Sequence, residues 1–312
     1  MGAIYSWRRG IISCQIAKGV VIRGHGKSFI IRSRGQDIAC EIRGKVKFET
    51  DSVTPVAVGD DVTISVDSDG TGMIESVEKR RSMFFRPAKG SESKKQVLAA
   101  NIDQLAAVIS VMQPPLKPGL IDRFLIAAEI GGLRPVVIIN KIDLGRIPIL
   151  DEIEKWYAAL GIEYHIISAL NGDGMETLEK SLTGHKTIFA GHSGVGKSTI
   201  LNRMIPGLDL KVGAISESTD KGIHTTTQIE LFELPRGGYV VDSPGLKVLG
   251  LWDVQKEELD EFFPEMLEYR DSCRFTGCSH THEPDCAVKQ AVDEGRIADF
   301  RYKSYLTIYN SI

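Results

Sequence analysis

A glycine-rich run that ends in lysine and serine is the part of this sequence best suited to chemistry. Residues 191–198 read Gly-His-Ser-Gly-Val-Gly-Lys-Ser and fit the pattern G-x-x-x-x-G-K-S. The run follows an apolar, strand-like segment (187–190) and precedes a helix-like one (199–204), the setting that a phosphate-binding loop needs. Glycines let the backbone N–H groups turn toward phosphate oxygens. We therefore expect phosphate contacts from Gly191, His192, Ser193, Gly194, Val195, Gly196, Lys197, Ser198 and Thr199.

The phosphate loop and two further segments, 222–227 and 242–245, are expected to bind the phosphates and Mg²⁺ together. Lys197 is expected to reach the β- and γ-phosphates, and the Ser198 hydroxyl to ligate Mg²⁺. Asp242-Ser243-Pro244-Gly245 matches D-x-x-G, which predicts that Asp242 holds a Mg²⁺-bound water and that the Gly245 N–H meets the γ-phosphate. Residues 222–227 read Gly-Ile-His-Thr-Thr-Thr and offer a second protein ligand for Mg²⁺. We favour Thr226 for that ligand, and Thr225 and Thr227 remain alternatives.

The sequence Asn140-Lys141-Ile142-Asp143 predicts that the base is guanine. It closes a buried strand-like segment (135–139), and ligands bind at the carboxyl ends of strands in α/β sheets. A carboxylate at Asp143 can accept from N1–H and from the exocyclic amine of guanine, a donor pair that adenine lacks. We expect Asn140 to brace the neighbouring loops and Lys141 to cover the ring face. Ser168 and Ala169 end the next strand, where a backbone N–H can meet guanine O6.

The order of these motifs is unusual, because the guanine motif precedes the phosphate loop by some fifty residues. The usual GTPase chain order is the reverse, so the chain reads as a GTPase cut and rejoined at a new point. Many GTPases orient the attacking water with a glutamine directly after the D-x-x-G glycine. This chain has Leu246 there, so turnover is intrinsically slow or another group takes the role. His224 is our catalytic candidate, and the alternative is that it only packs or is solvated.

The first part of the chain is expected to form a small barrel. Five short strand-like segments, punctuated by glycines, fall at 20–22, 28–31, 38–42, 62–65 and 73–77. Such spacing fits an OB-fold, an oligonucleotide-binding scaffold, although other small barrels would read the same way. Residues 1–100 carry a balance of +6 and the remainder one of −9. The excess favours a polyanion at the barrel end or, equally, a well-solvated surface.

The remaining segments divide the chain further. Residues 82–100 are polar around Lys89–Lys95 and predict either a plain tether or a segment that orders on binding. From residue 101 strands alternate with helices, which predicts an open α/β sheet covered by helices. We see no apolar run long enough for a transmembrane helix and no clear secretory signal, and therefore expect a cytoplasmic protein.

Three of the five cysteines cluster near the end of the chain. Cys273, Cys278, His280 and Cys286 supply three thiolates and one imidazole, a ligand set for tetrahedral Zn²⁺. All four positions would be filled by protein, so we expect a structural site that stabilises a small region. His282 competes with His280 as the fourth ligand. Cys14 and Cys40 are expected to be ordinary residues of the N-terminal region.

Taken together, the motifs resemble the circularly permuted GTPases, and with the barrel and the Cys/His cluster the whole chain resembles the bacterial ribosome-small-subunit-dependent GTPase A family. The resemblance rests on Gly-His-Ser-Gly-Val-Gly-Lys-Ser, His-Thr-Thr-Thr and Asp-Ser-Pro-Gly, and covers roughly residues 19–310. It implies GTP hydrolysis stimulated by the small (30S) ribosomal subunit, binding to 16S rRNA late in assembly, and release after hydrolysis. It also implies an OB-fold, a zinc domain, and His280 as the fourth zinc ligand. The family often has arginine before the histidine, where this chain has Ile223.

We therefore expect a multidomain protein with GTP/GDP, Mg²⁺ and one Zn²⁺. An all-β OB-fold-like RNA-binding barrel occupies 1–81 and a linker 82–100. A circularly permuted α/β P-loop GTPase domain follows at 101–256, and a mostly α zinc-binding domain at 257–312. Nothing indicates a coiled coil, so a monomer is expected. The rivals are a binding module that keeps GTP as a structural ligand and a metabolic phosphotransferase.

The permuted order also suggests how hydrolysis could change the position of a distant region of the chain. The D-x-x-G segment runs almost directly into the zinc region through residues 247–262. Our hypothesis is that loss of the γ-phosphate relaxes this segment and shifts the zinc region relative to the barrel.

Overall fold

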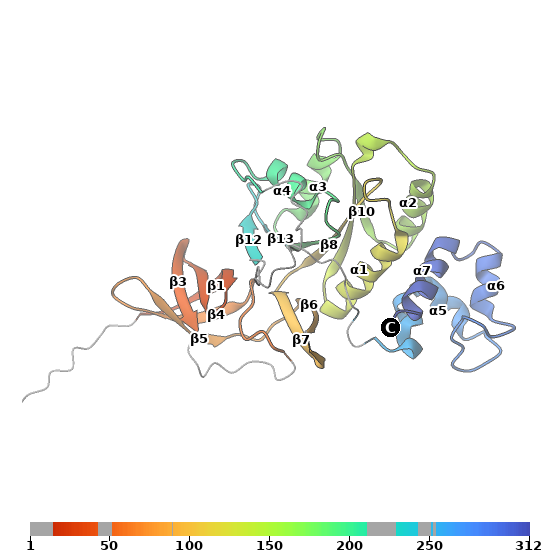
Figure 1. Cartoon of the computed structure of the whole chain (residues 1–312), viewed down its shortest axis with the longest axis horizontal. Helices are drawn as coiled ribbons and strands as arrows, with labels where there is room; N and C mark the ends of the chain where they lie inside the picture. Colours follow the sequence, from red (N-terminus) through yellow and green to blue (C-terminus); the bar gives the residue numbers. More distant parts are fainter. Residues whose placement is uncertain (1–14, 43–51, 89, 211–228, 243–250, 252–253) are drawn as a thin grey trace, which may run out of the picture.

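The computed structural model describes residues 15–42, 52–88, 90–210, 229–242, 251 and 254–312. An N-terminal barrel and a C-terminal group of short helices lie at opposite ends of a central α/β domain (Figure 1). The sequence-based expectations for His224, Thr225, Thr226, Thr227, Gly245, Leu246 and Cys14 fall outside the described residues.

The barrel consists of the five strands that the sequence indicates. They are β1 (Gln15–His25), β2 (Ser28–Ser33), β3 (Gln36–Ile42), β4 (Asp61–Val66) and β5 (Gly72–Val77). The pairs β1–β2, β2–β3, β4–β5 and β1–β4 are antiparallel and β3–β5 is parallel, which closes the sheet in the OB manner. Alternate residues fill the interior, where Ile31, Ile64 and Ile74 are fully buried. The expected OB-like barrel is therefore confirmed.

The segment that we expected to be a linker is instead a β-hairpin. Strands β6 (Met83–Ala88) and β7 (Ser91–Ala100) pair antiparallel and lie between the barrel and the helix α1 (Pro118–Gly131) (Figure 1). The polar composition of the tip concealed the apolar flanks, whose side chains Phe84, Val97 and Ala99 are buried. Apolar side chains that are buried on both strands of the hairpin therefore hold this segment in place.

The central sheet has the order β10-β9-β8-β11-β13-β12. Its strands are β8 (Gln104–Ser110), β9 (Arg134–Asn140), β10 (Glu163–Ile166), β11 (Lys186–Ala190), β12 (Ile229–Glu233) and β13 (Tyr239–Asp242). All neighbours are parallel except β12–β13. Strand β8 is buried at every residue, as its continuous apolar sequence predicts for a strand covered on both faces. The alternation of strands and helices from residue 101 is confirmed.

Helices cover both faces of this sheet. Helix α1 and helix α2 (Ile149–Ala159) pack on one face, where Ile121, Leu150 and Ile153 meet Val137 and Ile139. Helix α3 (Met175–Leu182) and helix α4 (Lys197–Met204) pack on the other. A short 3₁₀ turn, η1 (Ile142–Leu144), follows β9. The carboxyl ends of β8, β9, β10 and β11 consequently meet at one edge, and the predicted nucleotide motifs follow three of these strands.

The barrel is joined to the central sheet by direct strand pairing. Strand β1 pairs antiparallel with β12, the edge strand of the central sheet, through Arg23↔Glu230 and Gly24↔Ile229. Arg23 forms an ion pair with Glu230, and Arg32 bonds Glu233 at 3.2 Å. The two sheets are therefore continuous in hydrogen bonding, and the β12 edge of the central sheet is covered by β1.

The C-terminal region packs against α1 through a buried charged network. The region contains a 3₁₀ helix η2 (Lys256–Phe262) and the helices α5 (Pro264–Arg270), α6 (Ala287–Asp293) and α7 (Asp299–Tyr309). Arg301 of α7 pairs with Asp122 of α1 and with Glu265 of α5, at 2.6 Å for the latter. The hydroxyl of Tyr157 donates to Asp122 at 2.8 Å. Because Arg301 and Asp122 are both almost completely buried, separating the C-terminal region from the central α/β domain would leave a buried charge without its partner.

In the part of the chain that the structure describes, no helix combines the length and the apolar character needed to cross a membrane.

Candidate nucleotide site and metal centre

The phosphate loop connects β11 to α4, as the sequence predicts. A β-carbon at Gly191 would lie 2.1 Å from the carbonyl oxygen of Val108, so only glycine lets the loop pass this close to β8. Gly196 has a φ of 99°, and a β-carbon there would lie 2.2 Å from Nδ2 of Asn140. Both glycines are thus required by close approaches of backbone and side chain. The first N–H groups of α4 have no side-chain cap, and they are positioned to bind an anion.

Lys197 and Asp242 face each other across this loop. The Lys197 Nζ donates to the carbonyls of Gly191 at 2.7 Å and His192 at 3.0 Å, which holds it over the loop. Burial lowers the pKa of Lys197, and the Asp242 carboxylate opposes that shift. Burial raises the pKa of Asp242, and the Lys197 ammonium opposes it. The site therefore holds a cation where phosphate charge is expected and a carboxylate beside it.

The surroundings of Asp242 fit a hard cation. Oδ1 of Asp242 is buried and has no hydrogen-bond partner among the described residues. Buried carboxylate oxygens are normally paired or bound to a metal. Ser198 lies in the first turn of α4, the position from which its hydroxyl is expected to bind Mg²⁺. The donor set of Ser198 and Asp242 suits Mg²⁺, which prefers oxygen ligands.

Asn140 connects the phosphate loop to the loop after β10. Its Nδ2 donates to the carbonyl of Val195 at 2.9 Å, and its Oδ1 accepts from the N–H of Ala169 at 3.0 Å. The side chain is 2% exposed, so neither bond competes with water. The expected bracing role is seen in these two bonds, while contact with a base stays a prediction.

Replacing Asn140 by aspartate should weaken nucleotide binding. The Asn140→Asp carboxylate would face the Val195 carbonyl, and a buried donor–acceptor bond would become a contact between two acceptors. We expect GTP affinity to fall by about 10- to 100-fold. Fluorescent-nucleotide titration measures this, with Asn310→Asp on the exposed end of α7 as the matched control. Equal affinities of Asn140→Asp and the unaltered protein would show that the bridge does not support the site.

The guanine-side residues lie beside one another. The Ser168 hydroxyl donates to Asp143 Oδ1 at 2.5 Å and accepts from the N–H of Asn171 at 3.0 Å. Asp143 itself is exposed, so a ligand can reach its carboxylate. Lys141 has a left-handed backbone (φ 67°), and its ammonium donates to the carbonyl of Gln113. The structure thus places Asn140, Asp143, Ser168 and Ala169 in one hydrogen-bonded group.

Arg203 is a member of this site that the sequence did not suggest. From α4 its guanidinium donates to the carbonyls of Ala169 (3.3 Å), Leu170 (2.9 Å) and Asn171 (3.1 Å). It therefore fixes the guanine-side loop to the helix that starts at the phosphate loop. A single basic residue on a helix carries no signal that distinguishes such a clamp from a solvated side chain.

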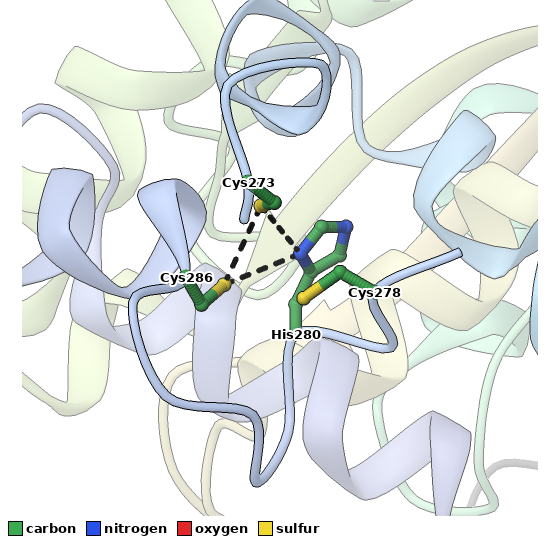
Figure 2. A group of neighbouring side chains, drawn as sticks. All are labelled: Cys273, Cys278, His280 and Cys286. Atoms are coloured by element: carbon green, nitrogen blue, oxygen red, sulfur yellow. Dashed lines mark hydrogen bonds between the residues drawn. The ribbon is translucent and has the colours of Figure 1, made fainter. Parts of the chain in front are cut away.

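A second site lies in the C-terminal region. The side chains of Cys273, Cys278, His280 and Cys286 converge, and their ligand atoms all lie within 4.8 Å of one another (Figure 2). The Nδ1 of His280 is 3.6 Å from Sγ of Cys273 and 3.4 Å from Sγ of Cys286, and these two sulfurs are 3.8 Å apart. Zinc–sulfur bonds of about 2.3 Å in a tetrahedron separate two sulfurs by about 3.8 Å, so this donor set fits Zn²⁺. His282 is exposed and bonds Thr281, outside the cluster.

The comparisons with known proteins agree with this architecture. The sequence matches the RsgA GTPase family over residues 77–252 and the RsgA N-terminal domain family over residues 18–74. A "Small ribosomal subunit biogenesis GTPase RsgA" from Bacteroides fragilis (strain YCH46) is 38% identical, covering 93% of this chain and 96% of that protein. The protein of the same name from Chlorobaculum parvum is also 38% identical, over 94% and 97%.

Two solved structures resemble the whole chain. YjeQ from Thermotoga maritima has a TM-score of 0.75 and 34% identity, covering 95% of this chain and 98% of that one. YloQ, described as a circularly permuted GTPase, has a TM-score of 0.70 and 28% identity, covering 98% and 97%.

The fold and the site define this protein as a circularly permuted P-loop GTPase, because the guanine-side loops after β9 and β10 precede the phosphate loop in the chain. The matches narrow that class: the chain belongs to the RsgA GTPase family and is a GTP hydrolase.

Proposed function

We propose that this GTPase acts on the small ribosomal subunit late in its assembly, binds 16S rRNA there, and is released after GTP hydrolysis. The observation that carries the proposal is the Asn140 bridge between the phosphate loop and the guanine-side loop. The bridge supports a GTP site at these loops, and the 38% identical relatives of this chain are named for small-subunit biogenesis.

In this proposal the two groups of loops divide the recognition of GTP between them. Asp143 accepts from the guanine donors, Ala169 offers its backbone N–H near O6, and Lys141 covers the ring. The loop from Gly191 to Thr199 wraps the phosphates, with Lys197 reaching the β- and γ-phosphates. Asn140 and Arg203 hold the two groups of loops in fixed relative positions, because their hydrogen bonds join the guanine-side loop to the phosphate loop and its helix.

The hydrolysis itself is an attack of water on the γ-phosphoryl group. When bound, Mg²⁺ would neutralise charge on the β- and γ-phosphates, with Ser198 and Asp242 as its proposed protein partners and Thr226 as a further ligand. Lys197 shares the same charge through its ammonium. Leu246 cannot orient water, so we assign that role to His224, a neutral imidazole that can accept a proton near pH 7.

We infer that the barrel provides most of the attraction to rRNA. The first hundred residues carry the basic excess, and Lys18, Lys27 and Arg34 are exposed on the barrel. In the C-terminal region acidic residues outnumber basic ones, which disfavours broad contact with phosphates. We propose that Zn²⁺ at Cys273, Cys278, His280 and Cys286 maintains the shape of that region. The protein acts as a cytoplasmic monomer in this account.

GTP hydrolysis measured with and without purified small subunits tests the proposal. We expect at least a tenfold stimulation by small subunits, none by large subunits, and little hydrolysis of ATP, because Asp143 suits guanine. A slow basal rate that small subunits leave unchanged would contradict the proposed partner. Bound but unhydrolysed GTP in every condition would instead favour a module that uses GTP as a structural ligand.

A further inference from the structure

His280 of the proposed zinc site has a buried polar neighbour in addition to the cysteines of the cluster. Its Nδ1 faces the sulfurs, so Nε2 is the nitrogen on the far side of the ring from the cluster (Figure 2). The Nε2 atom is buried, and it has no hydrogen-bond partner among the described residues. Its neighbour is Oδ2 of Asp260, at 3.6 Å. A buried N–H normally requires an acceptor, and this carboxylate oxygen is close enough to supply one after a small shift.

Asp260 is itself held in place. It lies in η2 with 6% of its surface exposed, and Oδ2 is 3.5 Å from Nη1 of Arg270. The charge of Arg270 compensates the buried carboxylate, so Asp260 can remain an acceptor beside His280. The two residues come from segments twenty positions apart in the sequence, and only the fold brings them together.

The backbone of His280 has an uncommon conformation that its neighbours must stabilise. Its φ of 57° lies in the left-handed region, where side chains other than glycine are uncommon. The hydroxyl of Tyr302 donates to the carbonyl of His280 at 2.7 Å, and the hydroxyl of Tyr305 donates to the carbonyl of Ser279 at 2.8 Å. These bonds fix the main chain, but neither determines the rotation of the imidazole ring.

We propose that Asp260 is the positioning residue of the metal centre: its carboxylate accepts the Nε2–H of His280 and keeps Nδ1 directed at the metal. Metal-bound histidines commonly donate their other N–H to a carboxylate, which fixes the ring and raises its basicity. The inference rests on the proposed zinc site. It adds that η2, which follows the segment leading from the GTPase sheet, contributes to that site directly.

The test compares zinc affinity in three full-length variants by competition with a chromophoric chelator. We expect Asp260→Ala to bind zinc about 10- to 100-fold more weakly, and Asp260→Asn to lose less because its amide oxygen can still accept. Asp271→Asn is the matched control, since Asp271 also approaches Arg270, at 3.6 Å, but is 91% exposed and does not contact His280. It should bind zinc as tightly as the unaltered protein.

A second measurement distinguishes positioning from general stability. NMR of zinc-loaded, ¹⁵N-histidine-labelled protein should show a His280 Nε2 proton protected from exchange, and Asp260→Ala should lose that protection. If Asp260→Ala does not fold, Asp260→Leu, which has a similarly branched side chain and also lacks an acceptor, replaces it in the same two measurements. Unchanged zinc affinity in the variant that lacks the acceptor, with only a lower melting temperature, would overturn the proposal, as would losses of zinc affinity in that variant and in Asp271→Asn that are equal. Protein that binds no zinc at all would instead refute the metal site itself.

Discussion

Asp143→Asn should convert the protein from a GTP-binding into a xanthosine-triphosphate-binding protein. Guanine presents two donors to the Asp143 carboxylate, N1–H and the exocyclic amine. Xanthine keeps N1–H but has a carbonyl oxygen in place of the amine. An asparagine side chain can accept from N1–H and donate to that oxygen. Opposed to guanine, the same amide would place two donors against each other and leave both unsatisfied, at a cost of about 1–3 kcal/mol each once the ligand buries them.

We expect GTP affinity to fall by about a thousandfold and the affinity for xanthosine triphosphate to rise to within about tenfold of the original GTP value. Competition titrations with the two nucleotides measure both. The fold should be preserved, because the asparagine oxygen can still accept from the Ser168 hydroxyl. Asp151→Asn, an exposed carboxylate paired with Arg146, is the control and should leave the nucleotide preference unchanged. A variant that binds both nucleotides like the unaltered protein would show that Asp143 does not read the base.

Removing the metal should unfold the C-terminal region while leaving the barrel and the GTPase sheet folded. Helices α5 and α6 have seven residues each, too short to be stable alone. Cys273, Cys278 and Cys286 pack within the apolar core of this region. Rearrangement of these ligands would therefore disturb the core itself. Structural zinc contributes about 10–16 kcal/mol in small zinc-binding peptides, so losing it should remove a large part of what stabilises a region of this size. The barrel and the central sheet have apolar clusters of their own and do not depend on the metal.

The measurement is limited proteolysis with a chelator present, and the same on Cys286→Ser. We expect rapid cleavage within residues 254–312 and a stable fragment that contains the barrel and the sheet. The fragment should itself melt at a lower temperature, because loss of Arg301 leaves Asp122 buried without its counter-charge. Cys40→Ser is the control: Cys40 is a buried barrel residue outside the cluster, and its replacement should leave zinc stoichiometry unchanged. Equal protease resistance with and without zinc would contradict the structural role of the metal.

Local sequence predicts much of this structure, because the motifs lie where the chain leaves a strand. Strand β11, the loop from Gly191 and helix α4 were recognisable together, since the glycines, Lys197 and the apolar strand give independent signals. The five barrel strands were recognisable from apolar runs separated by glycines. The hairpin β6–β7 was misread, because its polar tip dominates the composition while the burial of Phe84 and Val97 depends on distant elements.

Long-range contacts account for what the sequence could not predict. Arg203 and Asp260 have no local pattern that distinguishes them from surface charges, and their roles arise from partners more than fifteen residues away. The same holds for Arg301, which is buried only because α7 docks on α1. The pairing of β1 with β12 likewise joins strands that are far apart in the sequence, since the paired residues Arg23 and Glu230 are 207 positions apart. Such contacts depend on tertiary packing, which residue types and spacing do not encode locally.

We propose that GTP controls how long the protein stays on the small ribosomal subunit. The most direct measurement is co-sedimentation of the protein with purified small subunits in the presence of a non-hydrolysable GTP analogue or GDP. We expect retention with the analogue and release with GDP, with at least a tenfold difference in affinity, because the γ-phosphate is the group that Lys197 and the D-x-x-G segment are expected to recognise. Equal binding with both nucleotides, or no binding with either, would contradict it.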